Sequence, residues 1–213
     1  MNYQIRQLLF SVMFVFTALS AEAAFPDISR IYRESPGLNG LDVCSGGGCA
    51  VVGHVSLTNE EWQKVMKIFI PAETILTDAQ AAEQERRQIS EAVGVLETIV
   101  GAKTSTSTDR AGTFNNSKFS GQLDCNDEAI NTTTYMRLMR KLGLIKLHEI
   151  EDMRSRNFFF NGWPHSTAVI HEIKTGDRYA VDSWFYDNGA PATIVPFALW
   201  KSGFIPPDSP VKK

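Results

Sequence analysis

The stretch that decides the fold is residues 121–129, GQLDCNDEA. Directly after it, apolar residues recur at helical spacing from Ala129 to Leu142, and Gly143 ends the pattern. The pattern therefore predicts a helix whose first turn carries Cys125. Unpaired backbone amides and the helix dipole stabilise a thiolate at such a position, so Cys125 is the first candidate for a nucleophile.

Upstream, the first residues have the features of a signal peptide. Arg6 and the terminal amine supply positive charge, residues 8–19 form an apolar run, and residues 21–23 (AEA) are a small-x-small cleavage site. The run is about a dozen residues long and too short for a bilayer, which needs roughly 20. We therefore expect residues 1–23 to be removed. The product would be periplasmic or secreted, with no stable membrane insertion after cleavage.

The remaining residues, 24–213, are enough for one domain with a substantial core and too few for two. The part from about residue 24 to residue 57 is rich in Gly, Pro and Ser and shows no sustained period, so we expect an irregular N-terminal segment. The formal charge of -3 is small and Lys and Arg are scattered. A nucleic-acid partner is therefore not expected.

The chain has three cysteines, and an oxidising compartment pairs those that it can. Cys44 and Cys49 enclose Ser-Gly-Gly-Gly, whose glycines let the backbone bring both sulfurs together. This predicts a disulfide between them and leaves Cys125 as a free thiol. The rival interpretation, a metal site of Cys44, Cys49 and His54, lacks a fourth ligand and a standard spacing, so no metal is expected.

The remaining pattern predicts helices first and strands later. A capping box at Thr58 opens a helix that reaches Phe69, and a second helix runs from Asp78 to about Val100, with Gly101 as its stop. A long loop of residues 103–121 follows and, with Trp163 at the rim, is the expected determinant of substrate choice. Strands are expected at residues 145–150, 166–173 and 178–185, and the last two form a hairpin around Thr175-Gly176. This order favours the α+β class with an antiparallel sheet.

A thiol hydrolase also needs an imidazole base and a group that orients it. His165 begins the first strand of the hairpin, and Asp182 lies on the second within an apolar stretch, where a carboxylate needs a partner. A loop of two or four residues places both on one face, whereas a three-residue loop separates them. With Thr175-Gly176 as the loop, residue 169 pairs with Asp182. Two other histidines, His148 and His171, are interpreted as structural.

Three short motifs carry a resemblance to a known superfamily: residues 121–129 (GQLDCNDEA), 164–169 (PHSTAV) and 179–182 (YAVD). In their residues and their order of Cys, His and Asp, they resemble the bacterial transglutaminase-like cysteine peptidases, over about residues 121–187. The resemblance implies a papain-like fold in which a helix bearing the cysteine packs on an antiparallel sheet. It also implies Cys125 as nucleophile, His165 as base and Asp182 as the group that orients the base.

The resemblance bears on two further residues of the same stretch. By analogy with the glutamine upstream of the papain nucleophile, Gln122 is a candidate oxyanion donor beside the Cys125 backbone amide. Members of the superfamily that clip adhesins bind calcium through acidic residues next to the cysteine, and Asp124 matches one such place. Asn126 stands where another acidic residue is expected, so no cofactor is expected and calcium is doubtful.

These observations lead to an exported thiol hydrolase or acyl transferase. It would act on peptide or side-chain amides through a thioester at Cys125, with a peptide or protein as its substrate. The alternative is a non-catalytic periplasmic binding module that retains the fold, and separation of Cys125 from His165 would favour it. Thiol-disulfide exchange is a third hypothesis, which the close spacing of Cys44 and Cys49 argues against.

Overall fold

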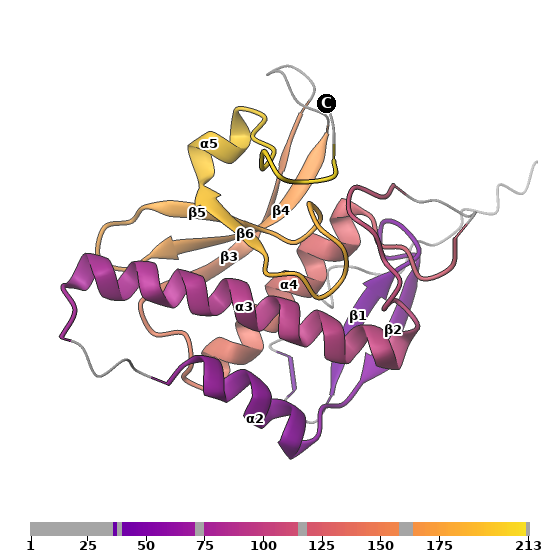
Figure 1. The fold of residues 1–213 in the computed structure, drawn as a ribbon, viewed down its shortest axis with the longest axis horizontal. Coiled ribbons are helices and arrows are strands. Elements are labelled where there is room, and N and C mark those ends of the chain that lie inside the picture. Colours follow the sequence, from indigo (N-terminus) through magenta and orange to yellow (C-terminus); the bar gives the residue numbers. More distant parts are fainter. Residues whose placement is uncertain (1–35, 38–39, 71–74, 115–118, 158–163, 212–213) are drawn as a thin grey trace, which may run out of the picture.

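The computed structural model describes residues 36–37, 40–70, 75–114, 119–157 and 164–211. The expected signal peptide, residues 1–23, and the expected rim residue Trp163 lie outside them. The elements follow one another along the chain as β1, β2, α2, α3, α4, β3, β4, β5, β6 and α5 (Figure 1). Helices thus precede the larger sheet, and the protein belongs to the α+β class, as predicted.

Two helices begin at capping boxes. Helix α2, Asn59–Ile68, is capped by Thr58, and helix α3, Asp78–Thr104, by Thr77. The predicted stop of α3 at Gly101 is wrong, because the helix continues for another turn and ends at Ser105 in the left-handed conformation. Gly101 serves packing instead, since a Cβ there would lie about 3.0 Å from the Asn188 side chain.

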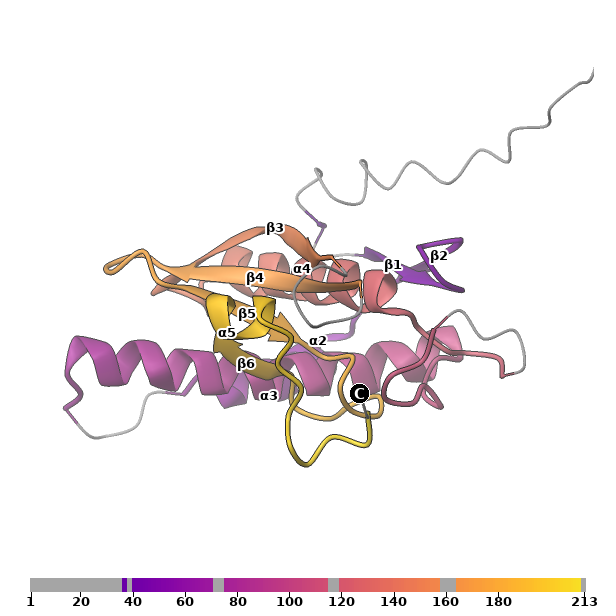
Figure 2. The same cartoon turned by 90° about the horizontal axis from the view of Figure 1, so that it is seen from above.

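Helix α4, Cys125–Lys141, begins at the predicted nucleophile. It packs against the four-stranded antiparallel sheet of β3 (His148–Arg156), β4 (His165–Glu172), β5 (Arg178–Asp182) and β6 (Thr193–Pro196), which adjoin in that order. Figures 1 and 2 show α4 beside β3 and β4, whereas α3 runs along the whole molecule and the short helix α5, Phe197–Lys201, follows β6. The helix that carries Cys125 therefore lies next to the strand that begins with His165.

The β4–β5 hairpin sets the distance between His165 and Asp182. Its pairs include Ala168 with Val181, and the Glu172 amide donates to the Asp177 carbonyl at 2.8 Å. The loop is therefore residues 173–176, four residues long, and Asp182 falls opposite position 167. The pairing of residue 169 with Asp182, which assumed a two-residue loop, is wrong. Both loops have an even number of residues, so His165 stays on the predicted face of the sheet. It lies two residues along β4 from the position opposite Asp182, whereas the two-residue loop would have placed it four residues away.

Part of the segment that was predicted to be irregular, residues 24–57, forms a second sheet. Strands β1 (Leu41–Ser45) and β2 (Val51–Val55) are antiparallel, and the predicted Cys44–Cys49 disulfide closes the turn between them with a Cα–Cα distance of 4.5 Å. The strands form because Leu41 and Val43 alternate inward and are 2% and 3% exposed. This alternation is short and is followed directly by glycines, which is why the sequence did not predict the strands.

One large apolar core joins these parts. It takes side chains from β1, β2, α2, α3, α4 and the four-stranded sheet, including Val65, Leu96, Met136 and Ile170. A smaller cluster of Cys125, Ala180, Trp184, Phe185 and Trp200 lies at the start of α4. Among the residues that the structure describes, no helix has both the length and the apolar character needed to cross a bilayer.

Candidate active site

The local sequence places Cys125 at the first turn of α4. The carboxylate of Asp124 caps the helix and accepts hydrogen bonds from the amides of Asn126 and Asp127, each at 2.9 Å. Cys125 follows this cap directly and is 7% exposed, with aromatic side chains around it. The thiol therefore lies at the positive end of a helix dipole, as the sequence predicted.

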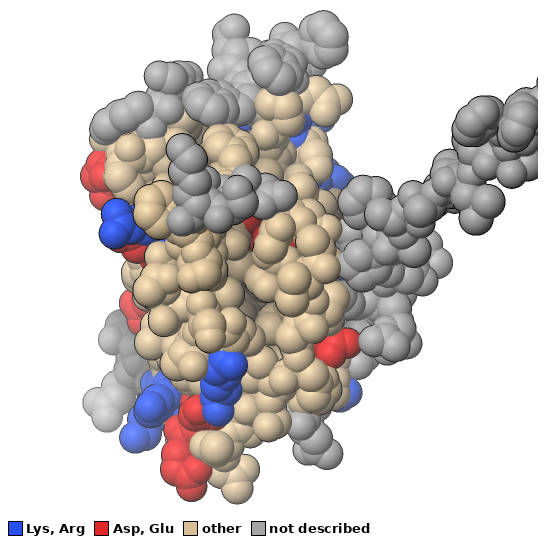
Figure 3. Space-filling model, turned by 90° about the vertical axis from the view of Figure 1, so that its right-hand side faces the viewer, with Lys and Arg blue, Asp and Glu red and all other residues tan. Residues whose placement is uncertain are grey.

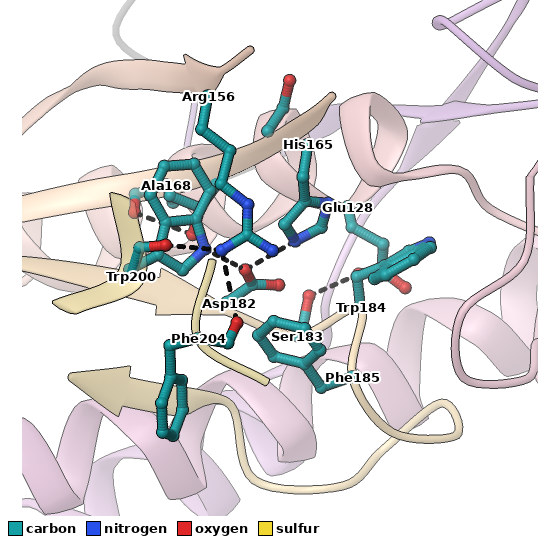
Figure 4. Close-up of polar contacts among 12 residues, drawn as sticks. Glu128, Arg156, His165, Ala168, Asp182, Ser183, Trp184, Phe185, Trp200 and Phe204 are labelled. Atoms are coloured by element: carbon teal, nitrogen blue, oxygen red, sulfur yellow. Dashed lines mark hydrogen bonds and ion pairs between the residues drawn. The ribbon is translucent and has the colours of Figure 1, made fainter. Parts of the chain in front are cut away.

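His165 and Asp182 meet from neighbouring strands. His165 Nε2 lies 2.7 Å from Asp182 Oδ2, and both side chains are 2% exposed (Figure 4). The other ring nitrogen, Nδ1, is buried and has no hydrogen-bond partner among the described residues. Because Cys125 interacts electrostatically with His165, the structure brings together all three members of the predicted triad.

The surroundings of His165 favour its charged form. Burial lowers the pKa of the ring, but Asp182 and then Cys125 raise it, and the net result is a pKa of about 9. An imidazolium at neutral pH can give up a proton from Nδ1 while Asp182 holds Nε2. This is the arrangement that a base needs when it must return a proton to a leaving group.

Sequence reasoning missed the aromatic groups that hold this pair. The Trp200 indole Nε1 donates to the same Asp182 oxygen at 2.6 Å, so that carboxylate oxygen accepts two hydrogen bonds (Figure 4). The rings of Trp184, Phe185 and Trp200 lie 4.6, 5.4 and 5.7 Å from the His165 ring, centroid to centroid. They fix the imidazole plane and exclude water from it.

A buried cation, Arg156, was also missed. Its guanidinium donates to the Trp200 carbonyl at 2.5 Å and to the Phe204 carbonyl at 3.2 Å, and it stacks 4.8 Å from the Trp200 ring. Burial lowers the pKa of Arg156, whereas Asp182 and Cys125 act in the opposite direction. In the sheet Arg156 pairs directly with His165, a cross-strand relation that could have been found only once the β3–β4 register was known.

Three buried carboxyl groups lie behind the first turn of α4. Glu97, Asp109 and Glu128 are 5%, 4% and 4% exposed, and Ser183 donates to Glu128 Oε2 at 2.5 Å. Burial is the largest cause that raises the pKa of each carboxyl. Repulsion by Asp109 adds to it at Glu97, whose pKa is about 7, and repulsion by Glu97 and Asp109 adds to it at Glu128. Glu97 and Glu128 also line a cavity of about 140 Å³.

Gln122, the predicted oxyanion donor, contacts a loop. Its Nε2 donates to the Thr108 carbonyl at 3.0 Å, and its Oε1 accepts from the Arg110 amide at 3.2 Å. Through these contacts Gln122 holds residues 108–110 beside the start of α4. Its role at an oxyanion stays a prediction.

The acidic residues next to Cys125 do not fit calcium. Besides the helix amides, Asp124 accepts a hydrogen bond from the Gly48 amide at 2.9 Å. Asp127 accepts from the amides of Gly47 and Cys49 at 2.8 and 2.6 Å. Carboxylate oxygens that face several amide protons are poorly placed to face a cation as well. Within the described part of the chain, no group of three or more His, Cys, Asp or Glu residues is arranged to hold a metal ion.

Comparison of the chain with family models, with curated proteins and with solved structures gives no match. The chemistry of the site therefore has to be argued from its side chains.

Proposed function

We propose that the protein is a thiol hydrolase or acyl transferase that acts on amides through a thioester at Cys125. One observation carries this proposal: Asp182 holds His165 through Nε2, while the other ring nitrogen, Nδ1, has no hydrogen-bond partner in the described part of the chain and is left to interact with Cys125. A histidine that served only to support the core would be expected to use both ring nitrogens. His148 does so, since its nitrogens lie 2.8 Å from Glu85 Oε1 and 3.1 Å from Arg86.

The chemistry follows from these positions. The Cys125 thiolate attacks the acyl carbon, and the His165 imidazolium then protonates the leaving amine from Nδ1 as the carbon–nitrogen bond breaks. The neutral imidazole next takes a proton from water, the water oxygen attacks the thioester, and the acid and the free thiol are released. If an amine enters in place of water, the same steps make a new amide.

The papain-like or transglutaminase-like fold is part of the proposal. In its favour, the cysteine begins a helix that packs on an antiparallel sheet, and the histidine and aspartate lie on the adjacent strands β4 and β5. The order of the three along the chain agrees with the resemblance.

The two other hypotheses receive less support. A non-catalytic binding module predicts that Cys125 and His165 are far apart or that Asp182 faces away, and neither holds. Thiol-disulfide exchange needs a resolving cysteine, but Cys44 and Cys49 are bonded to each other in a separate apolar cluster.

A peptide or protein is the proposed substrate, met outside the cytoplasm, where a disulfide persists. Phe114 is 43% exposed and its ring lies 5.2 Å from that of Trp184, which in turn contacts His165. This aromatic rim suits an apolar side chain of a substrate. On the face drawn in Figure 3, charged side chains lie mainly near the edges and basic ones are not gathered into a patch.

Alkylation of the thiol tests the triad without knowledge of the substrate. Wild-type protein and His165→Ala would be treated with iodoacetamide near pH 6, and labelling at Cys125 followed by mass spectrometry. We expect the variant to react at least about tenfold more slowly, because it lacks the imidazolium that stabilises a thiolate beside it. His171→Ala on the same strand is the matched control, and its rate should equal that of the wild type. Equal rates for wild type and His165→Ala would overturn the proposal.

A substrate screen would then separate hydrolysis from transfer. Exported proteins would be incubated with wild-type protein or Cys125→Ala, with and without a primary amine, and the products identified by mass spectrometry. New chain ends that require Cys125 indicate hydrolysis, and amine-tagged carbonyl groups indicate transfer.

A further inference from the structure

The loop that the disulfide closes, residues 44–49, runs from the end of β1 into the turn before β2 and has a backbone shape that a simple hairpin does not need. Gly46, Gly47, Gly48 and Cys49 have φ angles of 83°, 85°, 60° and 61°, four left-handed residues in succession. Three of them are glycines, which adopt this conformation at little cost, but Cys49 carries a side chain and adopts it while bonded to Cys44. Successive amides in such a turn point to one side and form a concave anion receptor. We call residues 44–49 the disulfide loop.

Two carboxylates fill this receptor, and both belong to the first turn of α4. The amides of Gly47 and Cys49 donate to the two oxygens of Asp127, and the amide of Gly48 donates to Asp124. Asp124 directly precedes Cys125 and Asp127 follows it by two residues. The disulfide loop therefore binds a residue on each side of Cys125 in the sequence.

A second contact fixes the loop one turn further along α4. The amide of Asn131 is bound at both ends, because its Oδ1 accepts from the Cys44 amide at 2.7 Å and its Nδ2 donates to the Cys44 carbonyl at 2.9 Å. The disulfide itself is buried against Ile130. The loop and the helix thus form one rigid unit.

The electrostatic consequence concerns the thiolate. A thiolate at Cys125 would be a third negative charge beside the carboxylates of Asp124 and Asp127, and their repulsion would disfavour it. Six backbone amides, three from the disulfide loop, two from α4 and that of Asp124, donate to these carboxylates and offset part of their charge. Two cationic groups also interact with Cys125: His165 from β4 and Arg156 from β3.

We propose that the disulfide loop is the positioning element of the nucleophile: it binds Asp124 and Asp127, holds the first turn of α4 in place and shields Cys125 from their charge. The proposal rests on Cys125 being the nucleophile of the proposed function. Gly47, Gly48 and Cys49 are positioning residues that act through Asp124 and Asp127. The loop also binds Asp124, the carboxylate that the resemblance would give to calcium.

The test compares the pH dependence of Cys125 alkylation by iodoacetamide in variants of the full mature chain. Cys44→Ser combined with Cys49→Ser opens the loop, and we expect the midpoint of the rate profile to move up by about one pH unit, which is a tenfold slower reaction near pH 6. Gly48→Ala perturbs the receptor without a steric clash, since nothing lies within 4 Å of the added Cβ. It should move the midpoint in the same direction by a smaller amount, and it decides the matter if the double variant does not fold.

Gly143→Ala is the matched control. It also lies at a positive φ, 71°, with nothing within 4 Å of the added Cβ, but it follows the opposite end of α4. It should cost similar stability and leave the profile unchanged. An unchanged profile in the folded double variant, or an equal shift in Gly143→Ala, would overturn the proposal.

Hydrogen exchange separates this proposal from the proposed function. Opening the loop should speed exchange at the amides of residues 126–128, and this outcome does not depend on catalysis. If His165→Ala leaves alkylation unchanged but the loop variants lose protection at these amides, the proposed function fails and the positioning of α4 stands. Unchanged protection in the loop variants would show that the loop does not hold the helix.

Discussion

Replacing Glu97 by Gln should stabilise the protein at alkaline pH and leave its stability at acid pH nearly unchanged. Burial is the largest cause that raises the pKa of Glu97 from 4.5 to about 7. The folded protein keeps a proton that the unfolded chain has already released between these values. The stability that protonated Glu97 contributes is therefore complete below about pH 4.5 and is lost as the pH rises through about 7.

The raised pKa of Glu97 sets the expected size of this loss. The interval from 4.5 to about 7 corresponds to about 3 kcal/mol, since each pH unit is worth about 1.4 kcal/mol. Glu97 faces Glu128 from α4 and Asp109 from the loop before α4, and Lys103 and His54 line the adjoining cavity. Gln keeps an acceptor for the Gly189 amide, which lies 3.1 Å from Glu97 Oε2, but cannot acquire charge.

Urea unfolding at about pH 5 and about pH 8 measures the effect. We expect Glu97→Gln to exceed the wild type by about 2–3 kcal/mol at the higher pH, with only a small difference at the lower. The pKa of His165, raised to about 9, adds an alkaline loss of its own, but this loss is common to both proteins and cancels in the comparison. Glu91→Gln, exposed on the same helix, is the control and should show no pH-dependent difference. A Glu97→Gln variant that loses as much stability as the wild type would refute the reasoning.

Three further predictions concern the site and its support. Trp200→Phe removes one of two donors to Asp182 Oδ2, so the free energy of unfolding should fall by about 1–2 kcal/mol and alkylation of Cys125 near pH 6 should slow severalfold. Unchanged alkylation would mean that His165 alone holds the carboxylate. Gly94→Ala would place a Cβ 2.7 Å from the carbonyl oxygens of Gly189 and Ala190, and urea unfolding should show a loss of about 2 kcal/mol or more. Millimolar calcium or a chelator should change neither the melting temperature nor the alkylation rate, whereas a clear rise in melting temperature with calcium would contradict the fit of Asp124 and Asp127 to amides.

The helix start and the strand parity could be predicted because both are local. Capping residues and apolar spacing set the start of α4, and the period of two along a strand sets the face of His165 whichever even loop is chosen. The register itself could not be fixed, because the Glu172–Asp177 hydrogen bond that makes the loop four residues long is not visible in the residue types. Gly101 was misinterpreted for a similar reason. Its role is to let Asn188 approach α3, and that neighbour is remote in sequence.

Groups that depend on tertiary contacts could not be found. Arg156 pairs with His165 only after an irregularity in β3 shifts the register between Glu151 and Arg154. Trp200 reaches Asp182 from a five-residue helix that has no strong sequence signal. Both became visible once the fold placed them beside a pair that the sequence had already indicated.

One of the buried carboxyl groups, Glu128, connects the two elements that carry Cys125 and Asp182. Cys125 and Glu128 are one turn apart on α4, and Asp182 and Ser183 are adjacent at the end of β5. The hydrogen bond from Ser183 to Glu128 therefore ties the helix that begins with Cys125 to the strand that ends with Asp182. The disulfide loop holds the same turn of α4 through Asp124 and Asp127. The first turn of α4 is thus fixed from two directions, and the burial of its acidic groups Asp127 and Glu128, which raises their pKa values, contributes to a stability that falls as the pH rises.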